Sequence, residues 1–195
     1  MRFYDVDDGE VIINGKNIKS IPNEELKKMF GVVFQNDTIF NDSVYENISF
    51  GRDIPFDVVE KACEYACAKE FIEKLEYKFQ TILSPKGTNI SGGQKQRLLI
   101  ARSLAGNPDI LILDDATSAL DYKTDSLVRK AINENYANTT SIIVTQRISS
   151  IMFCDHILVI EEGDTIGYGT HEELMKSCDV YKEIYISQMG GDINE

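Results

Sequence analysis

Three features are missing from this sequence, and each absence argues against a class of protein. No apolar run approaches the length of about 20 residues that spans a bilayer, and the first residues show no signal-peptide pattern. Positive charge is scarce, with 20 Lys and Arg against 32 Asp and Glu and a net charge of −12. Because a nucleic-acid binder needs a basic face, we expect no nucleic-acid partner. We expect a cytosolic chain that can dock on a membrane protein.

Cysteines are few, and their spacing does not suggest a metal site. Of the four, Cys63 and Cys67 lie four residues apart on a predicted helix, and we expect reduced thiols in the core. The sequence also lacks internal repeats and low-complexity segments. Its 195 residues, 43% of them hydrophobic, suffice for one domain or for a domain with a subdomain.

The most informative stretch begins with a glycine-rich helix start. The small residues there let backbone N–H groups approach an anion, and the positive end of a helix dipole favours phosphate. The residues concerned are Ser91, Gly92, Gly93 and Gln94.

An apolar run follows at residues 110–113 and predicts a buried strand, which ends in Asp114 and Asp115. Carboxylates at the carboxyl end of a parallel strand lie where α/β folds place ligands. Such a pair can hold Mg²⁺ and orient a water molecule.

The order and spacing of these segments resemble the ATPase domains of ABC transporters. Residues 90–94 are similar to the signature motif of that family, residues 111–115 to its Walker B strand, and residues 118–121 to its D-loop. Without the resemblance, the same residues would be a glycine-rich helix cap followed by an ordinary core strand. The resemblance implies an α/β fold of the P-loop NTPase type, with a mainly parallel sheet, an inserted helical subdomain and part of an antiparallel β subdomain.

The resemblance also implies ATP and Mg²⁺ as cofactors. The nucleotide would meet Ser91, Gly92, Gly93, Gln94 and the D-loop residue Asp121. Gln35, which ends a predicted strand over residues 31–34, is similar to the Q-loop glutamine of the family. It would contact the metal together with Asp114, and it would also contact the attacking water and couple to the transmembrane partner.

By the same resemblance the chain divides into four segments. Residues 1–35 are a remnant of the β subdomain with the core strand that leads to the Q-loop. Residues 36–105 are the helical subdomain with the signature. Residues 106–189 are the core with Walker B, D-loop and switch region, and residues 190–195 are a flexible tail.

A Walker A loop is not found in these residues. The pair Gly15-Lys16 is followed by Asn17 instead of Ser or Thr, and it lies in a predicted hairpin. On its own, the chain should bind ATP weakly or not at all. Because the chain begins in the middle of the fold, we expect a fragment of a longer protein.

Two departures from the family pattern predict an asymmetric mechanism. Asp115 stands where competent members carry Glu, and Gln146 stands where the switch His is usual. Both changes resemble the degenerate half of heterodimeric exporters. We therefore predict catalytic positions Asp115, Gln146 and Gln35 with weak activity, and an intact signature that acts on the ATP of a second ABC ATP-binding domain. The transmembrane domain would be the other partner, at the cytoplasmic face of the cell membrane.

Two alternatives remain. A related ATPase split by a coiled coil is disfavoured, because Gln35 and Ser91 are joined by a compact helical block without sustained heptads. A non-catalytic interaction module that folds against a partner would keep the ancestry and lose the activity. The transported substrate does not follow from the sequence.

Overall fold

The computed structural model describes residues 1–190, so most of the predicted tail, residues 190–195, lies outside the described residues. The chain divides into two compact units, Met1–Val144 and Thr145–Glu195, and each is described by itself. Within the described part, no helix has both the length and the apolar character that a bilayer crossing needs. The four segments expected from the sequence are a finer division and stay a prediction.

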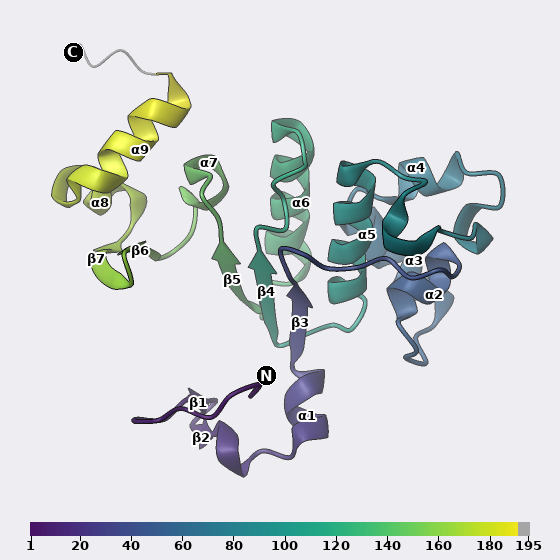
Figure 1. The fold of residues 1–195 in the computed structure, drawn as a ribbon, viewed down its shortest axis with the longest axis horizontal. Coiled ribbons are helices and arrows are strands. Elements are labelled where there is room, and N and C mark those ends of the chain that lie inside the picture. The colour runs from purple at the N-terminus through teal and green to yellow at the C-terminus, as the bar shows by residue number, and fades with distance from the viewer. Residues whose placement is uncertain (191–195) are drawn as a thin grey trace. The chain divides into compact units, whose positions relative to one another are not determined.

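A three-stranded parallel sheet organises the first unit (Figure 1). Val33 lies opposite Leu113, and Asp114 lies opposite Val144, so the carboxyl ends of the strands meet at one edge. This sheet, with its helices, confirms the predicted α/β fold with a parallel core. The strands, in sheet order, are β3 (Phe30–Val33), β4 (Ile110–Asp114) and β5 (Thr140–Val144).

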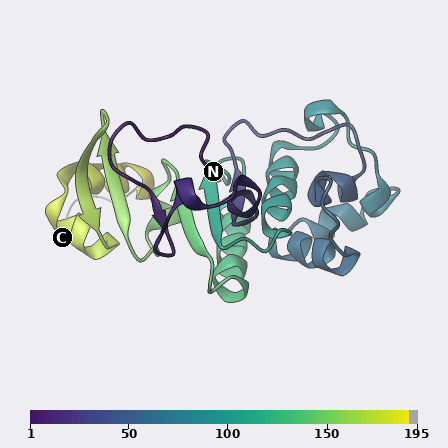
Figure 2. The ribbon, with the colours of Figure 1, turned by 90° about the horizontal axis from the view of Figure 1, so that it is seen from below.

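Most helices of the first unit lie in the block between β3 and β4, which Figure 2 shows grouped beside the sheet. One hydrophobic core runs from Leu111 and Leu113 on β4, through Leu98 and Ile100, into the rest of this block. The helices are α2 (Val44–Ser49), α3 (Phe56–Tyr65), α4 (Lys69–Glu73) and α5 (Gly92–Leu104), with 3-10 turns at Lys78–Gln80 and Pro85–Gly87; α6 (Tyr122–Asn135) follows β4.

The first residues form the predicted hairpin and lead into the sheet. Asn14 and Gly15 both have positive φ angles, 49° and 75°, as a tight two-residue hairpin turn requires. The turn joins β1 (Ile12–Ile13) to β2 (Lys16–Asn17), and the 3-10 turn Ile18–Ser20 and helix α1 (Asn23–Lys28) precede β3.

The second unit has its own small core. Its members are buried side chains from a short helix, a hairpin and two further helices: Ile148, Ile157, Leu174, Cys178 and Tyr181. The elements are α7 (Ile148–Ile151), β6 (Ile157–Glu161), β7 (Asp164–Gly169), α8 (His171–Ser177) and α9 (Asp179–Met189). The apolar residues on either side of Glu162-Gly163-Asp164 predict a strand pair, and β6 and β7 are paired antiparallel there.

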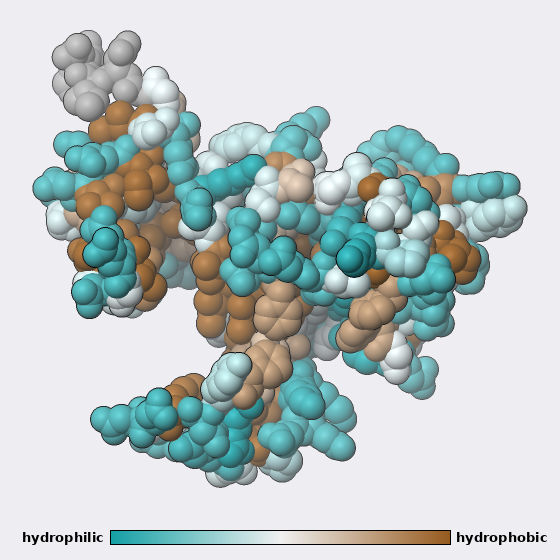
Figure 3. Space-filling view, in the orientation of Figure 1, coloured by the Kyte–Doolittle hydropathy of each residue, from teal (hydrophilic) through white to brown (hydrophobic). Residues whose placement is uncertain are grey.

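Strand β5 differs from expectation. The run at residues 141–144 predicts a buried strand, yet the side chains of Ile142 and Val144 are 48% and 53% exposed. The reason is position, because β5 lies at one edge of the described sheet, where it pairs only with β4, and its covered face is the one that carries Ile143, which packs against the core. Figure 3 shows apolar side chains gathered over this edge of the sheet.

The helical patterns of α3 and α6 predict buried faces that include Val58 and Leu127. The outer positions Val58 and Leu127 are partly exposed, because the apolar stripe of each helix is narrower than its apolar sequence. Ser43 followed three positions later by Glu46 predicts a capping box, and Ser43 Oγ does accept a hydrogen bond from the Glu46 N–H at 3.0 Å. The return bond of a capping box is not formed, since the Ser43 N–H donates to Asp42 Oδ1 at 2.7 Å instead.

Candidate functional site

Three predicted site residues lie at the carboxyl edge of the sheet. Asp114 ends β4, and Gln35 follows β3, the neighbouring strand. Asp115 comes directly after β4, and its N–H donates to the carbonyl of Val144 at 2.9 Å. The structure therefore places all three on adjacent strand ends, while their catalytic and metal-binding roles stay predictions.

The backbone at Asp115 offers a physical reason for a short side chain. Its φ angle is +50°, in the left-handed region where Asp and Asn are enriched among residues other than glycine. Its carbonyl accepts a hydrogen bond from Ser118 Oγ at 2.9 Å, which closes the turn into the D-loop segment, residues 118–121. Asp115 therefore stands, at the position where the family usually has Glu, in a turn whose positive φ angle Asp adopts readily.

The signature residues form the first turn of α5. Ser91 Oγ accepts from the Gln94 N–H at 3.2 Å, and Gln94 Oε1 accepts from the Ser91 N–H at 2.9 Å. This capping box satisfies two amides and leaves the N–H groups of Gly92 and Gly93 without a hydrogen bond within residues 1–190. The two glycine amides lie at the positive end of a 13-residue helix and are open to an anion.

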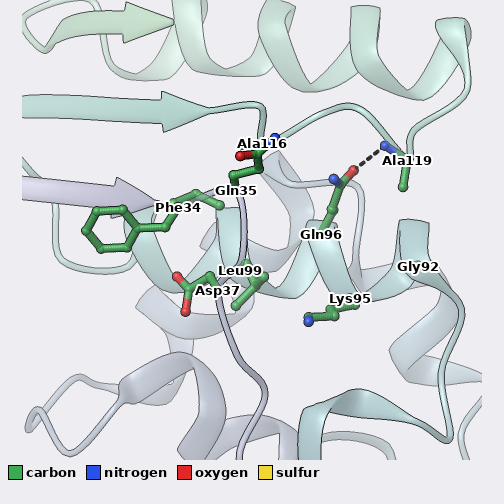
Figure 4. Close-up of a pocket in the computed structure, with 10 residues that line it drawn as sticks. Phe34, Gln35, Asp37, Gly92, Lys95, Gln96, Leu99, Ala116 and Ala119 are labelled. Carbon is green, nitrogen blue, oxygen red and sulfur yellow. Dashed lines mark hydrogen bonds between the residues drawn. The ribbon is translucent and has the colours of Figure 1, made fainter. Parts of the chain in front are cut away.

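A side chain of α5 fastens the D-loop segment to the signature helix (Figure 4). Gln96 Oε1 accepts from the Ala119 N–H at 2.7 Å, and Gln96 Nε2 donates to Ser118 Oγ at 3.0 Å. The two segments pack closely at Gly93, where an added Cβ would stand only 3.1 Å from the Ala119 carbonyl oxygen. Sequence analysis does not reveal Gln96, since its partners lie 22 and 23 residues further along the chain.

A cavity of about 150 Å³ opens between Gln35 and the first turns of α5. Its lining combines the amides of Gln35 and Gln96 with the charged side chains of Asp37 and Lys95 (Figure 4). Drug-sized ligands usually occupy about 300 Å³ or more, so this space suits water or one small group and not a nucleotide.

Asp121 is the last residue of the predicted D-loop segment, and its carboxylate has a local function. Asp121 Oδ1 accepts from the Thr124 N–H at 2.9 Å, and Oδ2 accepts from Thr124 Oγ1 at 2.7 Å. Asp121 is therefore the N-cap of α6. Hydrogen bonds from the backbone and side chain of Thr124 lower the pKa of Asp121. A contact between Asp121 and nucleotide stays a prediction.

The cap makes α6 sensitive to acid. Because the folded pKa of Asp121 is lowered, its contribution is complete above the ordinary Asp pKa and is lost as pH falls through the folded pKa. Asp121→Asn keeps a good cap without a titrating carboxyl, so it should lose less thermal stability than the wild type when the pH drops below about 3. Asp121→Ala should be less stable at neutral pH. Melting curves at neutral pH and below about pH 3 test this. An equal drop in melting temperature on acidification for the wild type and Asp121→Asn would contradict it.

A buried arginine joins the segment after Gln35 to the helical block. From α5, Arg102 donates through Nε to the Asn47 carbonyl at 2.7 Å and through Nη1 to the Thr38 carbonyl at 3.0 Å. Its Nη1 also lies 3.4 Å from Asp37 Oδ1. Burial lowers the pKa of Arg102. In the sequence, its only sign is a charged residue within the largely apolar second half of α5, residues 98–104.

Gln146, the predicted switch residue, belongs to the second unit and precedes α7 by two positions. The residue is exposed. Its carbonyl accepts a hydrogen bond from Gln188 Nε2 at 2.6 Å, which ties the segment to α9.

The donor set at the strand ends suits magnesium only in part. No group of three or more His, Cys, Asp or Glu side chains positioned for a metal ion occurs in residues 1–190. Asp114 and Gln35 offer one carboxylate and one amide oxygen at the same edge of the sheet. Because Mg²⁺ in nucleotide sites is usually held by one or two carboxylates together with substrate phosphates, the two residues fit a shared site that phosphates complete.

Comparison with known proteins identifies the family. The family model described as ABC transporter matches residues 1–118, which is more than half of the chain. The chain belongs to the ABC transporter family. The signature, the Walker B strand end and the Gln35 segment described above all fall within the matched residues.

Individual ABC relatives match over almost the whole chain. The ATP-dependent lipid A-core flippase of Aliivibrio fischeri is 39% identical over 191 residues, which are 97% of this chain and 33% of the relative. A candidate multidrug export ATP-binding/permease protein of Staphylococcus aureus is 42% identical over 188 residues, 96% of this chain and 32% of the relative. The chain thus spans about a third of the length of these relatives.

A solved structure confirms the ABC ATPase fold. A bacterial Atm1-family ABC exporter with ATP bound superimposes with a TM-score of 0.91 and 33% sequence identity, covering 98% of this chain and 34% of that one. The predicted relationship to exporter-type ABC proteins is therefore confirmed at the level of the family.

Proposed function

We propose that the chain is the ATP-binding part of an ABC exporter and that it works at the cytoplasmic face of the membrane. Support comes from the relatives, whose names describe a flippase, an export protein with a permease, and an exporter. The chain accounts for about a third of each, which leaves room for a transmembrane domain that it would drive.

The signature would act on ATP held by a second ABC ATP-binding domain. The observation that carries this proposal is the pair of open amides at Gly92 and Gly93, with Ser91 and Gln94 fixed around them by the capping box. Amides aimed at phosphate stabilise developing negative charge without needing a proton. The fixed D-loop contact through Gln96 holds the adjoining segment beside this surface.

The half-site built on this chain would be the slower one. Asp114 and Gln35 would hold Mg²⁺, which when bound offsets the negative charge of the nucleotide phosphates. Asp115 would orient water less well than Glu, because its carboxylate is one methylene shorter, and a displacement of that size can cost about 10²-fold in rate. Gln146 cannot carry a proton near neutral pH. These substitutions favour a heterodimer in which the partner's site, completed by this signature, does most of the hydrolysis.

Ser91→Ala in the assembled exporter tests the proposal. We expect ATP turnover to fall about 10²-fold or more, because the variant removes the signature hydroxyl and loosens the turn that presents the two glycine amides. The change also removes a helix cap, which alone costs about 1 kcal/mol of stability.

Thr170→Ala is the matched control, because Thr170 and Glu173 form the same kind of capping box on α8 in the second unit. Its stability loss should be similar and its turnover unchanged. Equal turnover in the two variants would refute the trans-acting signature.

A further inference from the structure

The last turn of α9 holds the main chain on both sides of Arg147. Gln188 Nε2 donates to the Gln146 carbonyl at 2.6 Å, and Gln188 Oε1 accepts from the Ile148 N–H at 2.9 Å. Arg147 is the N-cap of α7, and its side chain makes no capping hydrogen bond. The first amide of α7 therefore obtains its partner from a side chain 40 residues further along the chain.

The geometry restrains the segment strongly, because a side-chain amide is planar and its donor and acceptor are both in use. One hydrogen bond would fix a distance, whereas two from a single amide also fix the orientation of the main chain between Gln146 and Ile148. The helix that carries Gln188 is itself anchored. Tyr181 at its start is buried, and the Tyr181 hydroxyl lies 2.8 Å from Nδ1 of His171 on α8.

We propose that Gln188 is a positioning residue for the switch segment, residues 145–148, and that ATP turnover at the half-site using Gln146 depends on the docking of α9. The proposal rests on the function proposed above, in which Gln146 occupies the switch position. Both hydrogen bonds of Gln188 join main-chain atoms of the segment, so Gln188 would act through the placement of Gln146 and not on nucleotide.

Amide hydrogen exchange in the full-length protein tests the positioning. Gln188→Ala should speed exchange about tenfold in residues 146–150, because Ile148 loses its acceptor and the segment opens locally. Ser187→Ala, an exposed neighbour on α9, is the matched control and should leave exchange unchanged. Exchange at β6 reports whether the second unit stays folded. Unchanged exchange at 146–150 would overturn the proposal, and so would acceleration spread evenly over the unit, which would mean general stabilisation only.

The functional part is tested in the exporter that carries Asp115→Glu together with Gln146→His, where the slow half-site should regain turnover. Adding Gln188→Ala should lower that turnover about tenfold with KM unchanged, because substrate binding is kept and the switch side chain is misplaced. Unchanged turnover would overturn the dependence on α9. If adding Gln146→His to Asp115→Glu raises turnover no further than Asp115→Glu does, the assignment of Gln146 fails, while the exchange result still decides whether Gln188 positions the segment.

Discussion

Replacing Arg102 with methionine should lower the free energy of unfolding of the first unit by about 3–5 kcal/mol. The guanidinium is inside the protein, with 8% of the side chain exposed, and it donates to Asn47 and Thr38 and faces Asp37. Methionine has a similar length but no donors. The change therefore leaves buried carbonyl groups and one carboxylate without their partner.

The guanidinium also lies against two aromatic rings. Its carbon Cζ is 4.7 Å from the centre of the Phe50 ring and 5.5 Å from that of Phe40, so the cation joins the start of the helical block to the end of α2. Lysine should not rescue the site, because one ammonium cannot reproduce the planar fork that serves several carbonyls at once. We expect Arg102→Lys to recover less than half of the loss.

Urea denaturation followed by circular dichroism measures the effect as a shift of the midpoint. Lys130→Met is the control for the loss of a cation, because Lys130 and Glu134 form an exposed pair at 3.8 Å and such pairs contribute about 0–1 kcal/mol. If Arg102→Met shifted the urea midpoint no more than Lys130→Met does, the hydrogen bonds and ring contacts of Arg102 would not contribute to the stability of the fold.

The sequence is informative wherever the cause of a structure is local. The hairpin at Asn14-Gly15, the capping box of Ser91 with Gln94, and the cap of Thr170 with Glu173 are all set by residues within three positions of one another. Such patterns place the candidate site, because they fix where a helix starts and where a strand ends.

The same patterns cannot reveal contacts between distant segments. Gln96 with Ala119, Arg102 with Thr38, and Gln188 with Ile148 join positions 23, 64 and 40 residues apart. Each is a polar residue on a helix, which by itself is equally compatible with solvent exposure. The exposure of β5 does not follow from the sequence for a related reason, since an apolar run does not say whether both faces of a strand will be covered.

Two glycines should respond in opposite ways to alanine. A Cβ at Gly31 on β3 would stand 2.5 Å from the Ser103 carbonyl oxygen of α5 and 2.8 Å from Pro108 Cγ. A main-chain carbonyl in a helix cannot turn aside, so Gly31→Ala should force strand and helix apart and cost about 3 kcal/mol. Gly31 is therefore needed for the close approach of the sheet to the signature helix.

Gly92 provides the matched substitution. A Cβ there would lie 3.6 Å from Ala119 Cβ, an ordinary contact, and alanine is a better helix former than glycine by up to about 1 kcal/mol. Gly92→Ala should therefore leave the melting temperature unchanged or raised, while it lowers ATP turnover in the assembled exporter because the methyl group lies beside the open amides. Melting curves and turnover together separate the two roles. We expect Gly31 to allow the close packing of strand and helix, and Gly92 to leave space for a phosphate beside the amides. A Gly92→Ala variant as unstable as Gly31→Ala would mean that both glycines serve the fold alone.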